Sequence, residues 1–449
     1  MGTAKYAEFV FGLSQLVEDA ASDRWSRIED DVHHALNGQA ASEARRLVPR
    51  ETRRAIGCFF TAGLIRREFD TLMRSEHDGQ ELFWDPTCGA GDLLLSAAGG
   101  LPLAESPALT VHRWASRLRG TDLHQPFIDA ARLRLLLLVL YRHRERGQLG
   151  GLSAAQVARA FPGLTQGDGL TELRMAAGAR PGRAVHLLLN PPYGPAAAPA
   201  ACSWSTGRTS SAALFTAAAV DVLGRRGRMT AVLPDVLRSG SRYRAWRAYI
   251  DERVSVEGIR SNGQFDDYTD IDVFTMTAVR RTGAVVSRDA GWQTGAAGDE
   301  GTATVGDSFT VSVGPVVDNR DVREGPLVPY LTARQLPPSD SMGMPERTRR
   351  FNGKLLTPPF VVVRRTSRPG QGVGGRPRGA GVLVLGDQPL AVDNHLITLV
   401  PTKRVGRGVR QCRDLLRTLG SPSTAKWLDE RIRCRHLTVS AAKAIPWAG

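Results

Sequence analysis

The feature that most constrains the fold is a regular alternation of apolar runs and helix-like stretches between residues 55 and 282. Short apolar runs bounded by turn residues are typical of buried strands, whereas longer amphipathic stretches are typical of helices. The runs that should form strands are residues 82–85, 118–122, 184–190, 228–234 and 273–280. Helices are expected at residues 126–143 and 210–224. Strands that alternate with helices predict an α/β fold with a largely parallel βαβ sheet.

Length and composition divide the chain into three regions. A chain of 449 residues is too long for one ordinary hydrophobic core, so more than one domain is expected. Residues 1–50 predict a helical N-terminal segment, and residues 51–284 contain the pattern of the sheet. A stretch rich in Gly, Ala and Asp at 287–307 predicts a linker or long loop. Residues 285–449 are expected to form a β-rich C-terminal domain, with strands at 360–365 and 381–386.

The charge of the chain is divided unequally. The 59 Lys and Arg residues and the 45 Asp and Glu residues give a formal net charge of +14. Residues 345–449 contain 20 of the basic residues and 6 of the acidic ones, so the last quarter of the chain carries the whole excess. A solvated arginine-rich surface would explain this distribution. A polyanion-binding domain joined to a neutral catalytic domain explains it better.

Cysteine usage and hydropathy favour a cytoplasmic protein. The five cysteines include no CxxC pair, which supports neither a disulfide framework nor a zinc cluster, so no metal is expected. The longest apolar run, residues 133–141, is too short to span a bilayer and is flanked by arginine. The N-terminal residues form an amphipathic pattern that contains acidic residues, which is not the pattern of a signal peptide. No membrane partner is therefore expected.

An asparagine, two prolines and a tyrosine end the apolar run in "LLLNPPYG" (residues 187–194). Proline cannot continue a sheet ladder, so the strand should break at Asn190. An ordinary turn would explain Asn-Pro alone. Open α/β sheets, however, bind their ligands at the carboxyl ends of the strands, where these four residues are expected to lie. Asn190, Pro191, Pro192 and Tyr193 are therefore candidate functional residues.

A Gly-x-Gly turn follows the strand expected at residues 82–85. In "DPTCGAGD" (residues 85–92), Gly89 and Gly91 allow the backbone to turn tightly and a ligand to approach it closely. The third glycine of a dinucleotide-binding fingerprint is absent, and no phosphate-binding lysine follows. The turn therefore suits a nucleoside with a small polar tail better than it suits a pyrophosphate.

Three acidic residues follow successive strands of the predicted sheet. Asp85 ends the first strand, Asp122 ends the second, and Asp168 lies in the short turn "GDGL" (residues 167–170). A carboxylate at the position of Asp122 can bind both hydroxyls of a ribose, and one at Asp168 suits an exocyclic amine. Each acid alone is more often a helix cap or a turn residue. Together with Asn190, the three acids predict one ligand-binding crevice.

The order of these motifs resembles that of one enzyme family. The motifs are "GCFFTAGLI" (57–65), "DPTCGAGD" (85–92), "GTDL" (120–123), "GDGL" (167–170) and "NPPYG" (190–194). They resemble the S-adenosylmethionine-dependent N6-adenine DNA methyltransferases, and more narrowly the γ-class, in which the cofactor motifs precede the catalytic motif and target recognition comes last. The modification subunits of type I restriction systems and many type II methylases belong to this class. Over residues 50–282 the resemblance implies a Rossmann-like class I methyltransferase sheet.

The resemblance also implies S-adenosylmethionine as the cofactor and a set of residues that bind it. Phe60, Thr61 and Asp85 would contact the methionine end together with the glycine turn, Asp122 would hold the ribose, and Asp168 would bind the adenine amine. The full set is Phe60, Thr61, Asp85, Thr87, Gly89, Gly91, Asp122, Leu123, Asp168 and Gly169. The chain departs from the family pattern after Thr61, where alanine replaces the usual proline.

The chemistry of the family explains the Asn-Pro-Pro-Tyr motif. An exocyclic amine conjugated to a purine is a poor nucleophile because its lone pair is drawn into the ring. The Asn190 side-chain oxygen and the Pro191 carbonyl would each accept one hydrogen of the amine, while Pro191 and Pro192 keep the turn stiff. Tyr193 offers a flat face on which a flipped base can stack. Phe265 matches a later aromatic position of the family, although a core phenylalanine is equally compatible with its surroundings.

These features together predict methyl transfer to the N6 amine of a flipped adenine in duplex DNA, within a restriction-modification or phage-defence system. The expected partners are double-stranded DNA and a specificity or restriction subunit. The basic C-terminal region corresponds by position and charge to a target-recognition region. The arginines expected to contact DNA lie in or beside a Gly-rich loop: Arg364, Arg365, Arg368, Arg376 and Arg378.

Other substrates fit the same motif. Cytosine N4, adenine in RNA and a protein glutamine amide all present an amine with the same chemistry. The basic tail argues against glutamine, and the absence of an obvious stacking-rich module argues against RNA. A non-catalytic DNA-binding subunit with the same fold is an alternative of another class.

Overall fold

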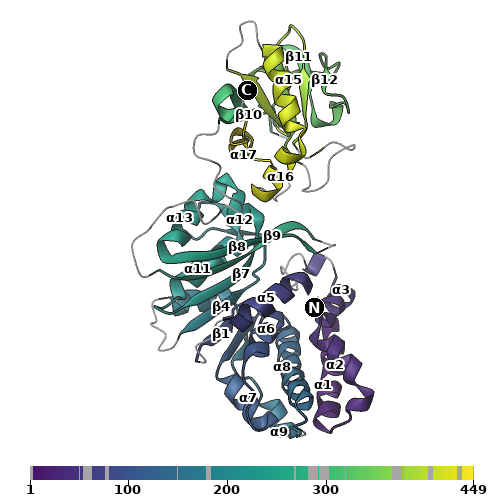
Figure 1. Cartoon of the computed structure of the whole chain (residues 1–449), viewed down its shortest axis with the longest axis vertical. Coiled ribbons are helices and arrows are strands. Elements are labelled where there is room, and N and C mark those ends of the chain that lie inside the picture. The colour runs from purple at the N-terminus through teal and green to yellow at the C-terminus, as the bar shows by residue number, and fades with distance from the viewer. Residues whose placement is uncertain are drawn as a thin grey trace. The chain divides into compact units, whose positions relative to one another are not determined.

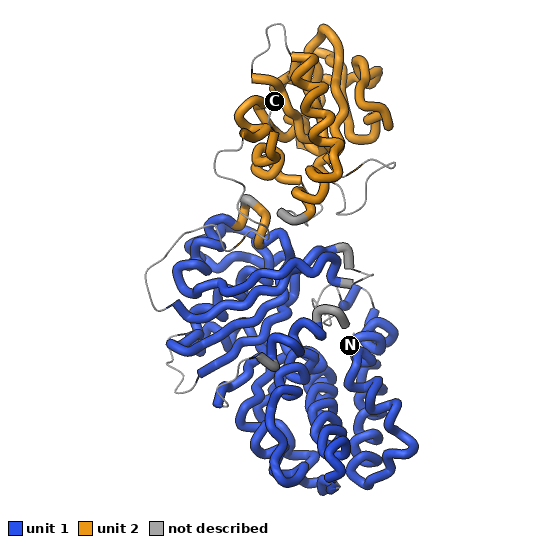
Figure 2. Tube along the Cα trace, viewed as in Figure 1, with its two compact units in different colours: residues 1–237, 244–291 blue, residues 238–243, 292–449 orange. Residues whose placement is uncertain are grey.

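The computed structural model of the chain is drawn in Figure 1. It describes residues 4–49, 51–53, 63–75, 80–148, 150–177, 184–266, 269–281, 292, 303–318, 320–366, 377, 379–402, 408–431 and 437–447. The chain forms two compact units (Figure 2): unit 1 comprises Met1–Leu237 and Arg244–Gly291, and unit 2 comprises Arg238–Tyr243 and Trp292–Gly449. Most of the predicted linker at 287–307 and of the Gly-rich loop at 367–381 lies outside the described residues. No helix in the described ranges has the length and apolar character needed to cross a membrane.

Unit 1 is built on a seven-stranded sheet with the order β3-β2-β1-β4-β7-β9-β8 (Figure 1). The first five strands in this order are parallel, and β9 is antiparallel to both of its neighbours. The strands are β1 (Leu82–Asp85), β2 (Leu118–Asp122), β3 (Leu164–Gln166), β4 (Val185–Leu189), β7 (Arg228–Pro234), β8 (Val254–Asp266) and β9 (Thr269–Arg280). The predictions at 82–85, 118–122 and 228–234 are therefore confirmed, whereas β3 and β8 were not predicted.

The direction in which successive strands are added to the sheet reverses at β4. The connections from β1 through β2 to β3 run one way, whereas those from β3 to β4 and on to β7 run the opposite way. Because parallel crossovers are right-handed, the helices of the two sets lie on opposite faces of the sheet. The helices are α1 (Ala7–Ala21), α2 (Glu29–Leu36), α3 (Gln39–Leu47), α5 (Gly63–Ser75), α6 (Asp92–Gly100), α7 (Pro107–Ala115), α8 (Gln125–Glu145), α9 (Ala154–Ala158), α10 (Gly169–Ala176), α11 (Ser211–Val222), α12 (Asp235–Ser239) and α13 (Arg244–Arg253).

Local sequence signals set the ends of several of these helices. Ser106 caps α7 by accepting a hydrogen bond from the Leu109 amide, and proline occupies the first turn of both α7 and α8. Asp168 caps α10 through the Leu170 amide. Since proline lacks an amide hydrogen and fixes φ, it fits the first helical turn, where no intrahelical partner exists.

The N-terminal helices belong to unit 1 and pack on its longest helix, α8. The hydroxyl group of Tyr6 donates to the Ala40 carbonyl at 3.1 Å, which joins the start of α1 to α3. The Tyr6 ring lies edge-on to the Phe127 ring of α8, with centroids 4.9 Å apart. The apolar run in the middle of α8 is buried, including Leu135, Leu136 and Leu137. The first helices thus cover an apolar face of the sheet domain instead of forming a separate body.

Unit 2 contains two sheets and a group of C-terminal helices. A five-stranded sheet has the order β10-β17-β14-β15-β12, and a three-stranded sheet has the order β13-β11-β16. The strands are β10 (Phe309–Val313), β11 (Leu327–Leu331), β12 (Ser341–Met342), β13 (Thr348–Arg350), β14 (Phe360–Arg364), β15 (Gly381–Val384), β16 (Ala391–Val392) and β17 (Leu396–Pro401). The helices are α14 (Val305–Ser308), α15 (Gly408–Leu419), α16 (Pro422–Arg431) and α17 (Val439–Lys443).

Unit 2 contains helices beside its strands, and these helices were not predicted from the sequence. Cys412, Leu415 and Leu419 of α15 are buried in one core cluster with Val361 of β14 and Leu399 of β17. These positions in α15 recur at helical spacing, so one face of the helix is apolar and covers the five-stranded sheet. The sequence of α15 therefore carries a helical pattern among its many arginines.

Candidate functional site

The predicted site residues gather at one edge of the sheet in unit 1. Asp85 ends β1, Asp122 ends β2, Asp168 follows β3 and Asn190 follows β4. These four strands are parallel neighbours in the order β3-β2-β1-β4, so their carboxyl ends lie at the same edge. The direction of the crossovers reverses between β1 and β4, and such a switch point is where open α/β sheets bind ligands.

The register of the strands sets how far each residue projects. Trp84 pairs with Leu187, so Asn190 lies two positions beyond the level of Asp85. That offset is about 7 Å along the strand direction at the usual rise per residue. Asp85 pairs with Gly120, so Asp122 also projects two positions farther than Asp85. Asp85 is therefore the deepest of the polar groups at this edge.

Asp85 is a buried carboxyl group with a strongly shifted pKa. The residue is 1% exposed, and its Oδ1 accepts a hydrogen bond from the Thr87 amide at 3.0 Å. Burial, with a smaller contribution from the nearby Asp122, raises the pKa of Asp85 to about 8, although the Thr87 hydrogen bond opposes the shift. At neutral pH the side chain is thus largely protonated and is ready to ionise when a cationic group approaches.

The glycine turn after β1 is held by Asp122. Gly89 and Gly91 both have positive φ, at 51° and 85°, which explains the need for glycine there. The Gly89 amide donates to Asp122 Oδ2 at 3.2 Å, and the His124 amide donates to Oδ1 at 2.9 Å. Burial also raises the pKa of Asp122. Both oxygens of this carboxyl group therefore accept a hydrogen bond from a backbone amide, and one of these amides belongs to the glycine turn.

The Asp168 turn lies directly against the loop that follows β1. A Cβ atom at Gly169 would come within 1.7 Å of the Pro86 carbonyl oxygen, so only glycine fits this contact. Asp168 itself is exposed and caps α10: Oδ1 accepts from the Leu170 amide at 3.0 Å and Oδ2 from the Thr171 hydroxyl at 2.8 Å. Asp168 therefore caps a helix, as considered from the sequence. The contact between Gly169 and Pro86 places it beside the loop that follows β1.

The Asn-Pro-Pro-Tyr turn forms a hydrogen bond that the sequence did not predict. The Tyr193 hydroxyl donates to Asn190 Oδ1 at 2.8 Å. Asn190 is half-buried, Pro191 is buried and Pro192 is half-buried. The oxygen expected to accept a hydrogen of the target amine is therefore in contact with Tyr193, and an incoming amine has to share or replace that contact.

Phe265 packs against Tyr193. The two ring centroids lie 5.7 Å apart with an angle of 90° between the ring planes, an edge-to-face contact. Tyr193 is 9% exposed and Phe265 is 1% exposed. Phe265 is thus a core residue that contacts the Asn-Pro-Pro-Tyr motif.

The other predicted residues are less constrained or are not described. Leu123 exposes 56% of its surface beside Asp122, and Thr87 is half-buried. Phe60 and Thr61 lie outside the described residues, as do Arg368, Arg376 and Arg378 of the Gly-rich loop. Arg364 and Arg365 are half-buried, and burial lowers the pKa of Arg364.

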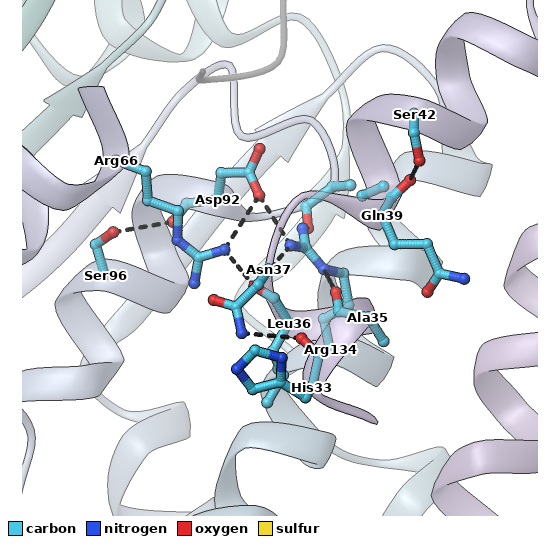
Figure 3. A network of polar contacts seen from close by, with 12 residues as sticks. His33, Ala35, Leu36, Asn37, Gln39, Ser42, Arg66, Asp92, Ser96 and Arg134 are labelled. Carbon is cyan, nitrogen blue, oxygen red and sulfur yellow. Dashed lines mark hydrogen bonds and ion pairs between the residues drawn. The ribbon is translucent and has the colours of Figure 1, made fainter. Parts of the chain in front are cut away.

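Two polar clusters beside the site were not predicted from the sequence. Arg134 of α8 bonds to Ala90 and Asp92 at the glycine turn (Figure 3), and its only signal was one charged residue inside an apolar run. Glu68 of α5 accepts hydrogen bonds from Asn262 of β8 and, at 3.3 Å, from Thr275 of β9. The second cluster joins α5 to the hairpin that contains Phe265, and it has no local sequence signal.

Comparison with known proteins is informative only at the level of structure. No protein-family model matches the sequence, and no curated protein matches it. The type IIL restriction-modification enzyme MmeI, solved in complex with DNA, is similar over 91% of this chain and 70% of that chain, with 11% identity and a TM-score of 0.53. At this identity the likeness shows a shared fold, and its coverage includes residues of both units.

Two shorter matches concern modification proteins. A modification subunit from Vibrio vulnificus YJ016 matches 51% of this chain and 47% of its own, with 21% identity and a TM-score of 0.35. The type I restriction-modification methyltransferase subunit from Streptococcus thermophilus matches 50% of this chain and 45% of its own, with 18% identity and a TM-score of 0.33. This chain thus spans about half the length of either protein.

Proposed function

We propose that this chain transfers a methyl group from S-adenosylmethionine to the N6 amine of an adenine flipped out of duplex DNA. The observation that carries the proposal is the arrangement of Asp168, Asp122, Asp85 and Asn190 along one edge of the sheet, at its switch point. The fold shared with MmeI, a restriction-modification enzyme, supports placing the activity in a restriction-modification system. Duplex DNA and a specificity or restriction subunit are the partners that this proposal implies.

The residues at the edge fit the chemistry of the cofactor. A protonatable Asp85 at the base of the site would pair with the cofactor's ammonium group, and the positive φ angles of Gly89 and Gly91 let the backbone approach it closely. Asp122 would bind the ribose hydroxyls, and the exposed Leu123 offers an apolar face to the adenine ring. The bound cofactor supplies an electrophilic methyl group on a sulfonium centre. We assign Phe60, Thr61, Thr87, Asp168 and Gly169 to the same site.

Asn190 and Pro191 would prepare the target amine. The Asn190 side-chain oxygen and the Pro191 carbonyl would each accept one N6 hydrogen, which frees the nitrogen lone pair for attack on the methyl carbon. The transfer would release S-adenosylhomocysteine and leave a positively charged methylated nitrogen. This nitrogen would lose one proton readily, so no strong base is needed. Before the base enters, the Tyr193 hydroxyl donates to the same Asn190 oxygen, which keeps the acceptor oriented. The Tyr193 ring, which Phe265 supports edge-on, would then stack on the flipped base.

The experiment that tests the function identifies the methylated base. Duplex DNA is incubated with the purified chain and methyl-labelled S-adenosylmethionine, and the nucleosides are separated by mass spectrometry. We expect labelled N6-methyladenine. Labelled N4-methylcytosine would show that cytosine, and not adenine, is the target base. DNA that stays unlabelled although the cofactor binds would contradict methyl transfer to DNA. Parallel reactions with RNA and with protein distinguish the remaining substrates.

Substitutions of Tyr193 should separate the role of its ring from that of its hydroxyl. Tyr193→Ala removes the stacking face and should lower kcat/KM on duplex DNA about ten-fold or more, since base–aromatic stacking contributes about 1–3 kcal/mol. Tyr193→Phe keeps the ring and its edge contact with Phe265 and removes only the hydrogen bond that orients Asn190, so most of the activity should be retained. The measurement is steady-state methylation of one duplex by both variants. Equal loss in the two would show that the hydroxyl is the functional part.

The basic region should bind the phosphate backbone. Replacing Arg364, Arg365, Arg368, Arg376 and Arg378 by alanine should weaken duplex binding, and the slope of log K against log salt should fall by about 0.9 for each phosphate that the variant no longer neutralises. Cofactor binding should not change, because the cofactor residues lie in unit 1. The measurement is a salt titration of duplex binding for the wild type and the variant.

A charge-matched variant controls for the loss of five positive charges. It replaces exposed arginines of unit 1: Arg113, Arg146, Arg159, Arg225 and Arg226. This control should leave the salt slope close to that of the wild type. If both variants lower the slope equally, the effect is one of net charge, and the C-terminal arginines make no particular contact with DNA.

A further inference from the structure

A buried guanidinium group joins the glycine turn to the N-terminal helices (Figure 3). Arg134 of α8 is 0% exposed and makes four hydrogen bonds. Its Nη1 donates to the Ala90 carbonyl at 2.6 Å, and its Nη2 donates to Asp92 Oδ1 at 2.9 Å. Its Nε donates to the Ala35 carbonyl at 2.8 Å, and Nη2 also reaches the Leu36 carbonyl at 3.4 Å.

The four acceptors belong to two structures that are distant in the sequence. Ala35 and Leu36 end α2, where the last carbonyls of a helix have no intrahelical partner and attract a cation. Ala90 and Asp92 flank Gly91 of the turn. A planar guanidinium group offers five donors in a fixed geometry, so it can bind both structures at once. Arg134 therefore sets the position of the turn relative to α2.

A second arginine supports the same contact from α5. Arg66 donates to the Leu36 carbonyl, and its Nη1 lies 3.9 Å from Asp92 Oδ1. The Asp92 side chain is 8% exposed and faces both guanidinium groups. Burial lowers the pKa of Arg66, which Asp92 opposes. Buried ion pairs of this kind contribute little net stability compared with apolar packing, so their effect lies in fixing one arrangement.

We propose that Arg134 is a positioning residue of the cofactor site, and that the carboxyl end of α2 is its anchor. The inference rests on the proposed function, because it assigns the glycine turn to the cofactor. Gly89 and Gly91 give the turn the positive φ angles that it needs, but glycine has no strong preference among backbone conformations. The hydrogen bonds from Arg134 select one of these conformations before the cofactor arrives. Such preorganisation lowers the entropic cost of binding.

The proposal gives the N-terminal helices a role in cofactor binding. The α2 carbonyls hold Arg134, and Arg134 holds the carbonyl in the middle of the turn. A change that displaces α2 would then reach the cofactor site through one side chain. The Asp122 contact to the Gly89 amide holds the start of the Gly-x-Gly segment, while Arg134 holds its middle carbonyl.

The test uses the full-length chain with Arg134→Lys as the main variant. Lysine keeps the positive charge near Asp92, but its single ammonium group cannot hold the turn and the α2 carbonyls together. Titration calorimetry should give a dissociation constant for S-adenosylmethionine raised about ten-fold or more, because the turn is no longer held in its binding conformation before the cofactor arrives. In methylation assays KM for the cofactor should rise, while kcat at saturating cofactor stays within about three-fold of the wild type.

Arg142→Met is the matched control on the same helix. Arg142 Nη1 donates to the Ala98 and Leu101 carbonyls, both at 2.9 Å, so it joins α8 to the opposite end of α6. This variant should bind the cofactor with an unchanged dissociation constant. A comparable loss of affinity in Arg142→Met would overturn the proposal, because it would show a general effect of α6–α8 packing.

Hydrogen exchange of the cofactor-free protein supplies a readout that does not depend on activity. Arg134→Lys should speed amide exchange in residues 86–94, whereas Arg142→Met should not. Normal exchange and normal cofactor affinity in Arg134→Lys would overturn this inference and leave the proposed function intact. If the wild-type chain fails to bind S-adenosylmethionine, the proposed function falls, and the assignment of the turn to the cofactor falls with it.

Discussion

Replacing Asn190 by alanine should lower kcat for methyl transfer by about 10²-fold or more, as when one preorganised hydrogen bond at a reacting atom is removed from other enzymes. The side-chain oxygen is one of two acceptors for the amine hydrogens, and the Pro191 carbonyl would remain as the other. The dissociation constant for the cofactor should hardly change, because Asn190 follows β4, whereas the acidic residues assigned to the cofactor lie at or after the ends of β1, β2 and β3. The measurement combines single-turnover kinetics with cofactor titration.

A second variant separates catalysis from disturbance of the turn. Asn190→Ala also leaves the Tyr193 hydroxyl without its acceptor in this motif. The double variant Asn190→Ala/Tyr193→Phe removes both partners, so it should be as inactive as the single variant. Recovery of activity in the double variant would mean that a misplaced Tyr193, and not the missing amide, caused the defect. Asn37→Ala, at an exposed asparagine after α2, is the control and should be fully active.

Replacing Asp85 by asparagine should raise the dissociation constant for S-adenosylmethionine about 10²-fold, since truncating one partner of a desolvated charge pair costs about 2–5 kcal/mol. Asparagine has nearly the shape of the carboxyl group but cannot become an anion. In the wild type, binding of the cationic cofactor should require the buried carboxyl group to lose its proton. Affinity should therefore increase by about ten-fold or more between pH 6 and pH 7.5, below the pKa of about 8.

The same substitution should have the opposite effect on stability. In the folded chain the pKa of Asp85 is about 8, far above its value of about 3.9 in an unfolded chain. Between these values the folded state holds a proton that the unfolded state has released. The contribution of Asp85 to the free energy of unfolding therefore falls as the pH rises from about 4 to about 8. An asparagine at this position cannot titrate, so cofactor-free Asp85→Asn should be at least as stable as the wild type at pH 8.

Thermal unfolding and calorimetry between pH 6 and pH 8 test both parts of this prediction. The difference in Tm between Asp85→Asn and the wild type should grow with pH, and the cofactor affinity of the variant should be flat where that of the wild type rises. Parallel Tm curves would show that Asp85 does not retain a proton in the folded chain. Unchanged cofactor affinity in the variant would remove Asp85 from the binding site.

Several strands of the sheet could be predicted because the pattern of each strand lies within a few consecutive residues. A short run that ends at Asp or Pro indicated a strand and the position of its end, as in β1, β2 and β7. The short strand β3 has one buried residue, and the long β8 contains bulges near Gly258 and Gly263. Neither has the clear pattern of a buried strand, so neither was predicted.

The placement of the acids followed from topology, although their contacts did not. Parallel strands joined by helices bring their carboxyl ends to one edge, and Asp85, Asp122 and Asn190 therefore meet there. The sequence could not show that Asp122 is aimed at the Gly89 amide, or that Gly169 touches Pro86. The first contact joins the ends of the neighbouring strands β2 and β1, whereas the second joins the loop after β3 to the loop after β1, across the end of β2. Both geometries depend on the register of the sheet.

From the sequence it could be predicted which strands end in polar residues and which side chains these are, because both are properties of short segments. Only the tertiary structure decided that Tyr193 donates to Asn190 and lies edge-on to Phe265, and that Arg134 joins the glycine turn to α2. A phenylalanine in the core and one beside a motif have the same local pattern. Burying an arginine without partners would be costly. The partners of Arg134 come from segments distant in sequence, so only their packing in the fold shows them.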